Sequence, residues 1–323
     1  PAMRSWSLAT WALCRAVADR WAGTLADVLR LAVPPRHAQA EVAAAADTAS
    51  AAMPGVAGAF GQPGTPEQPR GWARYVAGGR FVASLAAGRA PRAVWAALPG
   101  GAWPAEIAEL VAVTAASGRG ALVVVPDGRD AARVGAAVTA RLGASSCAVL
   151  TADLGPAERY RRFLAVSRAQ AGVVVGTRAA AFAPVANLGL VLVWDDGDDL
   201  HAEPRAPYPH AREVLLLRAH LAGAAAVVGG HAVTAEGARL VSTGWAKAVA
   251  PDRATLRRCA PRVIPGGDPA AGRDPSPGHR LPTVAWEAAH AALEQHTPVL
   301  VQVPRGGYLP ALSCDRCRTP LRC

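Results

Sequence analysis

The sequence lacks any hydrophobic run long enough to cross a membrane. Its longest apolar runs, such as Leu221–Gly230, stop well short of the ~18 residues that a membrane span needs. No export signal, with its basic, apolar and small-residue regions in order, opens the chain. These absences exclude a membrane protein and predict a cytoplasmic one.

The sequence also lacks the cysteine pattern of a disulfide framework. Three of its six cysteines are scattered, and the other three crowd the end of the chain: Cys14, Cys147 and Cys259, then Cys314, Cys317 and Cys323. This distribution indicates reduced thiols and a metal site. Because the chain starts at Pro1 and stops within an incomplete metal motif, we expect truncation at one or both ends.

Glycine and proline are too few for a disordered chain. The 32 glycines and 27 prolines among 323 residues lie below the ~25–30% at which composition alone indicates disorder. Many of them fall in residues 51–70 and 264–282, which we predict to be a long loop and an interdomain linker. The length and the 51% hydrophobic content suit two or three folded domains.

Positive charge is in excess. The chain has 34 basic and 24 acidic residues, a net charge of +10, which attracts polyanions such as nucleic acid. Lysine occurs only at Lys247, so a GC-rich coding bias toward arginine could supply part of this excess. Charge alone therefore leaves DNA binding open.

The first part of the chain is typical of two short helices. Residues 8–21 place apolar side chains at helical spacing, and Thr24 can cap a second helix over residues 25–31. A tight turn at Gly23 joins them, which is the pattern of a helix-turn-helix and of an ordinary helical hairpin. We assign residues 1–85 to a winged-helix-like segment.

From about residue 86, apolar β-branched runs alternate with helical segments. The predicted strands are 93–98, 121–125, 148–150, 172–176, 189–194 and 225–229, and the predicted helices are 105–116, 130–142, 156–169, 210–222 and 235–246. This alternation predicts an α/β domain with a doubly wound parallel sheet, whose ligands bind at the carboxyl ends of the strands. Beyond the linker, a helix at 283–295 and a strand at 298–303 indicate the start of another α/β unit.

A phosphate-binding loop is missing where one would be expected. After the first strand come Gly100 and Gly101, but Trp103 and Pro104 stand where the loop's lysine and hydroxyl residue belong. Without that lysine the β/γ charge of a triphosphate has no partner, and Pro104 removes an N–H from the helix start. We therefore regard this as a degenerate nucleotide site and expect no ATP binding.

Further motifs follow the later strands in a fixed order. They are Val173–Arg178, Leu190–Asp198, Tyr208–Arg212, Arg305–Leu312 and the Cys314-x2-Cys317-x5-Cys323 spacing. Together they resemble the PriA family of replication-restart proteins, also called primosomal protein N′, over about residues 8–323. The resemblance is specifically to its divergent actinobacterial branch, which lacks intact helicase motifs.

The resemblance implies a superfamily-two 3′–5′ DNA helicase architecture. That architecture comprises a winged helix, two RecA-like lobes and a zinc-binding insertion. Residues 86–263 would form the first RecA-like lobe, and residues 283–323 would begin the second lobe and the zinc-binding region. Most of the second lobe would lie outside this chain.

Gly176, Thr177 and Arg178 match the family motif on the DNA face of the first lobe. Physically, a glycine lets the backbone approach a phosphate, a hydroxyl donates to it, and arginine supplies charge. A satisfied turn after a strand is the alternative. Arg159, Arg161 and Arg162 could extend a basic face, but a solvated helix surface is the favoured interpretation.

Asp195 and Asp196 stand where the family has its Mg²⁺-holding and water-activating acids. Asp196 replaces the catalytic glutamate with a side chain one methylene shorter, so we interpret this degenerate Walker B motif as a relic; a retained Mg²⁺ site or a protein contact is the alternative. His210 and Arg212 match the family, and we expect them to orient this acidic loop.

The cysteines supply the most specific metal chemistry. Cys314 and Cys317 have the spacing of two adjacent corners of a tetrahedral Zn²⁺ site, and by resemblance Cys323 would begin a second site. Four ligands are needed for each ion, so both zinc sites are incomplete in this chain.

These features lead to one leading hypothesis and two alternatives. The first is a replication-restart primosome protein that binds forked or single-stranded DNA and recruits replisome-loading partners without helicase or ATPase activity, in the cytoplasm at the nucleoid. The second is an active ATP-dependent 3′–5′ helicase of the same family. The third, a doubly wound metabolic enzyme, finds no support, because no complete catalytic set follows any strand.

Overall fold

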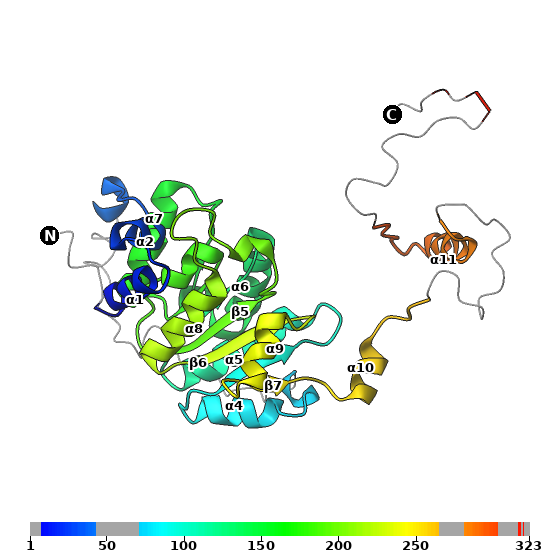
Figure 1. The fold of residues 1–323 in the computed structure, drawn as a ribbon, viewed down its shortest axis with the longest axis horizontal. Helices are drawn as coiled ribbons and strands as arrows, with labels where there is room; N and C mark the ends of the chain where they lie inside the picture. Colours follow the sequence, from blue (N-terminus) through cyan, green and yellow to red (C-terminus); the bar gives the residue numbers. More distant parts are fainter. Residues whose placement is uncertain (1–7, 43–70, 265–280, 303–315, 318, 320–323) are drawn as a thin grey trace. The chain divides into compact units, whose positions relative to one another are not determined.

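The structure is a computed structural model that describes residues 8–42, 71–264, 281–302, 316, 317 and 319 (Figure 1). The chain divides into two units, Pro1–Ala260 and Pro261–Cys323. In the described part of the chain, no helix combines the length and the apolar character that a membrane span requires.

The first unit is built on one sheet of seven parallel strands. Their order is β3-β4-β2-β5-β6-β1-β7, and every neighbouring pair is parallel. The strands are β1 (Arg92–Ala96), β2 (Gly120–Val124), β3 (Cys147–Leu150), β4 (Val173–Gly176), β5 (Leu188–Trp194), β6 (Ala225–Gly230) and β7 (Lys247–Val249). The predicted α/β, RecA-like fold class is confirmed, and the six predicted strands form with small differences at their ends.

Helices cover both faces of this sheet. They are α1 (Leu8–Arg20), α2 (Leu25–Ala32), α4 (Gly78–Ala86), α5 (Trp103–Ala116), α6 (Gly128–Leu142), α7 (Pro156–Ser167), α8 (Ala211–Ala222) and α9 (Ala235–Ser242). The last helix of this unit, α10 (Arg253–Cys259), has no buried residue. One core contains side chains of α1, α2 and α8, and the other contains side chains of α4, α5 and α6. Successive residues of a strand enter opposite cores: Val191 and Val193 the first, Leu190 and Leu192 the second. This two-sided burial explains why the strands are continuous apolar runs.

Polar side chains fix where several helices begin. Thr24, Asp127 and Thr234 accept hydrogen bonds from backbone N–H groups in the first turns of α2, α6 and α9. His210 does the same for α8, where its side chain accepts from the N–H of Arg212. The predicted cap at Thr24 is therefore confirmed, and so are the two helices that flank it.

The predicted winged-helix-like segment shares its cores with the sheet. From α1 and α2, Val17 and Val28 are fully buried in the same core as the strand residue Val191. After residue 70, Trp72 and Phe81 pack in the core on the opposite face. Residues 43–70, which contain the predicted loop 51–70, lie outside the described residues.

The second unit contains helix α11 (Thr283–Glu294), which confirms the helix predicted there. The strand predicted at 298–303 is wrong over residues 298–302, which have no strand structure, and residue 303 is not described. A strand needs a neighbour for its backbone hydrogen bonds, and the described residues of this unit supply none. Helix α4, strand β7 and helix α10 were not predicted from the sequence. Helix α9 ends at Ser242, and the following residues turn into the short edge strand β7 instead of continuing as helix.

Candidate functional site

The predicted site residues gather at the carboxyl edge of the sheet, in two places. The loop Gly100–Pro104 and the acidic turn from Asp195 follow β1 and β5, beside the end of β6. Gly176–Arg178 ends β4, beside the ends of β2 and β3. Because carboxyl ends of parallel strands hold the ligands in such folds, these are the two candidate sites.

At the first place, a tryptophan stack adjoins the loop that the sequence predicts to be a degenerate nucleotide site. Trp103 begins α5, is only 5% exposed, and stacks on Trp194 with ring centroids 4.3 Å apart and planes 6° from parallel. His231 meets the same indole of Trp194 edge-on, at 5.2 Å. Gly100 has φ +111°, a conformation that favours glycine, but its position faces open space. The loop thus has a glycine in a conformation that favours glycine, and the indole of Trp103 packs against Trp194.

The acidic turn after β5 is held by a buried ion pair. Arg212 Nη1 lies 2.9 Å from Asp196 Oδ2, and both side chains are under 10% exposed. The Thr234 hydroxyl donates to the same carboxylate oxygen at 2.8 Å. The prediction that Arg212 orients this turn is confirmed. Asp196 is thereby engaged within the protein, while Asp195 is exposed.

Negative charge also accumulates at this edge. Burial, followed by the charge of Asp127, raises the pKa of Asp130, and the Asp195 charge adds to that shift. The carboxylates of Asp127, Asp130 and Asp195 therefore act on one another at the carboxyl edge of the sheet.

His210 makes this edge sensitive to pH. Burial, the Arg212 charge and His201 lower the pKa of His210 from 6.5 to about 4. The unfolded chain therefore binds this proton near pH 6.5 and the folded chain only near pH 4, so stability is lost as pH falls through that window. We expect His210→Asn, which keeps an acceptor for the α8 N–H, to flatten the decline between pH 6.5 and 4 in urea denaturation. An equally steep decline in the variant would contradict this assignment.

At the second place, Gly176 permits a close crossing of two backbones. A Cβ on Gly176 would lie 2.2 Å from the carbonyl oxygen of Leu150, so no larger residue fits without movement. The next N–H, from Thr177, donates to that same carbonyl at 3.1 Å. The sequence motif is therefore explained in part by packing between β3 and β4.

Arg178 is engaged with the loop that follows β5. Its Nε lies 2.9 Å from Glu203 Oε2, and its Nη1 donates to the carbonyl oxygens of Leu200 and Ala202 at 2.6 and 3.0 Å. The buried side chain of Arg218 holds the short helix η5 (Arg178–Phe182) in place, because it donates hydrogen bonds to the carbonyl oxygens of Ala181 and Ala183. Burial lowers the pKa of Arg218 to about 10. A phosphate contact by Arg178 must therefore compete with Glu203.

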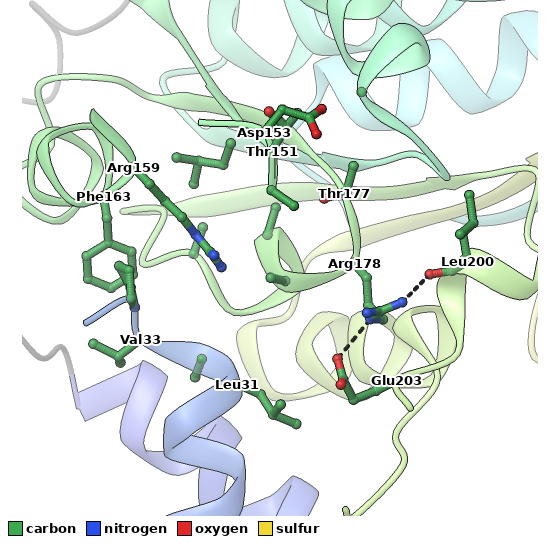
Figure 2. Close-up of a pocket in the computed structure, with 18 of the residues that line it drawn as sticks. Leu31, Val33, Thr151, Asp153, Arg159, Phe163, Thr177, Arg178, Leu200 and Glu203 are labelled. Carbon is green, nitrogen blue, oxygen red and sulfur yellow. Dashed lines mark hydrogen bonds and ion pairs between the residues drawn. The ribbon is translucent and has the colours of Figure 1, made fainter. Parts of the chain in front are cut away.

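A pocket of about 590 Å³ opens beside this motif (Figure 2). Its walls come from α2 with the Val33–Pro35 segment, from the ends of β2 and β3, from α7, and from the loop carrying Glu203. Thr177 and Arg178 line it, so two of the predicted DNA-face residues border this pocket. Apolar side chains such as Leu31 and Phe163 share the lining with four arginines: Arg30, Arg159, Arg178 and Arg205.

The zinc prediction falls mostly outside the described residues. Cys314 and Cys323 are not described, and Cys317 is exposed with its Sγ 3.2 Å from Thr319 Oγ1. The described residues include only one of the three cysteines, and they contain no group of three or more side chains that could hold a metal ion. Zinc therefore stays a prediction.

Two buried groups near the first place were not predicted from the sequence: the indole of Trp95 and the carboxyl of Glu106. The tryptophan stack continues through Trp95, whose ring centroid lies 5.3 Å from that of Trp194. On α5, Glu106 accepts from Arg74 at 2.7 Å and from the Tyr75 hydroxyl at 3.0 Å, while burial raises its pKa. Tryptophans at strand ends were a usable signal for the stack, but nothing local indicated the partners of Glu106.

Comparison with known proteins shows to which proteins this chain is similar. No protein-family profile matches the chain. The probable replication restart protein PriA of Mycobacterium tuberculosis is 51% identical over 314 residues, which are 96% of this chain and 46% of that protein. The Mycobacterium leprae protein of the same name is 50% identical over 314 residues, 96% of this chain and 47% of that protein.

A more distant relative matches a shorter part of this chain. The replication restart protein PriA of Bacillus subtilis is 31% identical over 121 residues, 38% of this chain and 15% of that protein. The chain spans about half the length of the mycobacterial relatives it matches. The motif order, the RecA-like sheet and this similarity agree, and the chain belongs to the PriA family of replication restart proteins, corresponding to part of its length.

Proposed function

We propose that this chain acts in replication restart by binding forked or single-stranded DNA without using ATP. The mycobacterial relatives are named as probable replication restart proteins, and this supports a role of the chain in replication restart. The observation that carries the proposed loss of ATP use is the Trp103–Trp194 stack, because Trp103 stands at the motif position of a phosphate-binding lysine and its indole is packed away against Trp194. An indole cannot neutralise a triphosphate.

DNA binding is supported by the second place on the sheet edge. The pocket beside Thr177 and Arg178 combines four arginines with apolar walls, on a chain of net charge +10. Arginines at the carboxyl edge of an α/β sheet suit a phosphate backbone, which dominates the affinity of DNA-binding proteins. We further propose primosome and replisome proteins as partners, Zn²⁺ at the cysteine motif, and a place at the nucleoid.

The proposal is tested by fluorescence anisotropy with forked and single-stranded oligonucleotides over a range of salt concentrations. We expect Arg178→Gln to weaken binding about tenfold and to lower the salt slope by ~0.7, the value for one phosphate contact on single-stranded DNA. Glu203→Gln should tighten binding several-fold, because it removes the carboxylate that competes for Arg178. A gain of affinity cannot come from misfolding.

The control is Arg89→Gln, which removes an exposed arginine near the start of β1, at the opposite edge of the sheet. Equal effects of Arg89→Gln and Arg178→Gln would contradict a specific DNA face. Mg-ATP should leave DNA affinity unchanged and should not be hydrolysed. Hydrolysis stimulated by forked DNA would favour the active-helicase alternative and overturn the proposal.

A further inference from the structure

The three arginines of α7 differ in what they face. Arg161 and Arg162 both pair with Glu158, at 2.7 and 2.6 Å. The hydrogen bond from Arg161, with a further one from Arg162, lowers the pKa of Glu158 to about 2. Arg159, one position along the helix from Glu158, is half-buried, lines the pocket, and has no ion pair within the described residues. Figure 2 shows its guanidinium reaching into the cavity from α7, with Phe163 beside it.

The other charges of the pocket are already engaged or lie at its rim. Arg178 faces Glu203 on the opposite side of the cavity from Arg159 (Figure 2). Arg30 pairs with Asp27 at 2.9 Å, outside the pocket lining. Arg205 is exposed. Among the described residues that line this pocket, Arg159 is thus the half-buried cation without an ion pair, and it is left for a ligand.

The two aspartates of the pocket point toward the start of α6. Asp127 accepts from the N–H of Asp130 at 2.9 Å as the helix cap. Asp153 has its Oδ2 2.6 Å from where a Cβ on Gly128 would lie, directly at the first turn of the same helix. The partial positive charge of a helix N-terminus stabilises both carboxylates there. Because both carboxylates lie at the start of α6 and neither pairs with Arg159, the side of the cavity that Arg159 lines stays positively charged.

We propose that this pocket binds one nucleotide of single-stranded DNA, with Arg159 on its phosphate and its base against the apolar wall of Leu31, Val33 and Phe163. The proposal rests on the DNA binding proposed above and names a residue and a subsite for it. A volume of about 590 Å³ lies within the ~300–1,000 Å³ of small-ligand pockets. An arginine that lies beside apolar side chains fits a nucleotide, in which a phosphate and a flat base are joined through one sugar.

The test compares a 16-nucleotide thymidine strand with an abasic strand of the same length, which keeps the phosphates and lacks the bases. We expect the unaltered protein to prefer the thymidine strand about tenfold, since a stacked base contributes that order of affinity. Arg159→Gln should weaken binding of both strands about tenfold and lower the salt slope by ~0.7. Arg161→Gln, the same charge change on the same helix, should weaken binding at most twofold.

The outcomes separate this proposal from the one on which it rests. If neither strand binds the unaltered protein, DNA binding itself is wrong and this subsite fails with it. If DNA binds but Arg159→Gln and Arg161→Gln behave alike, or the abasic strand binds as well as thymidine, DNA binding stands and the nucleotide pocket is overturned. If the Arg159→Gln variant keeps its affinity for DNA but loses affinity for an acidic peptide, the nucleotide pocket is also overturned, and the ligand of Arg159 is a protein.

Discussion

Arg212→Met is expected to lower the free energy of unfolding by about 3–5 kcal/mol, the cost of breaking a buried ion pair from one side. Arg212 and Asp196 lie 2.9 Å apart, with 7% and 3% of their side chains exposed. Removing the guanidinium would leave the Asp196 carboxylate buried, with the Thr234 hydroxyl as its remaining polar contact. Urea denaturation followed by circular dichroism measures the change.

The control for this prediction is Arg20→Met, which removes an exposed partner of Glu213 at 3.5 Å. Exposed pairs contribute about 0–1 kcal/mol, so this variant should stay close to the unaltered protein. Adding Asp196→Asn to Arg212→Met should restore part of the loss, because the unpaired charge is then gone. If Arg212→Met and Arg20→Met cost the same, the buried pair does not hold the acidic turn as we describe.

Trp103→Ala is the second change with a large expected effect, also about 3–5 kcal/mol of unfolding free energy. Its indole is 5% exposed and stacks on Trp194 at 4.3 Å, so truncation leaves a cavity at the end of the sheet. Exposing Trp194 should also shift tryptophan fluorescence to longer wavelength. The variant supplies no cation, so we expect it to bind ATP no better than the unaltered protein.

The matched control is Trp286→Ala on α11, where the side chain is 61% exposed. A surface change of this kind usually alters stability by no more than about 0.5 kcal/mol. A Trp103→Ala variant as stable as Trp286→Ala would show that the stack is not a packed part of the core. ATP binding by Trp103→Ala would show that the loop keeps a usable phosphate site beneath the indole.

Much of the fold was predictable because burial on both faces leaves a local signal. Runs such as Val173–Gly176 and Leu188–Trp194 are fully buried, so every residue in them is apolar or glycine. Short edge strand β7 was missed because it has three residues, two of them exposed, including Lys247. The strand predicted at 298–303 had the right composition, but composition cannot supply a neighbouring strand.

The candidate site was predictable in its motifs and not in its contacts. The order of the motifs placed Gly176, Thr177 and Arg178 on a strand end and marked Trp103 as a residue that cannot replace a lysine. The motifs did not indicate that Arg178 would pair with Glu203, which lies 25 positions further along the chain. Long-range pairs depend on how loops meet at the sheet edge, which leaves no local trace in the sequence.

The amino-acid sequence by itself determined the parallel sheet, its strand positions, the family motifs and the missing lysine. These follow from local composition and from the order of residues along the chain. Only the tertiary structure decided which of three similar arginines on α7 faces a cavity, and which charges are already paired. Arg159, Arg161 and Arg162 are alike in sequence. The packing of α7 against β3, beside a pocket that α2 also lines, is what distinguishes them.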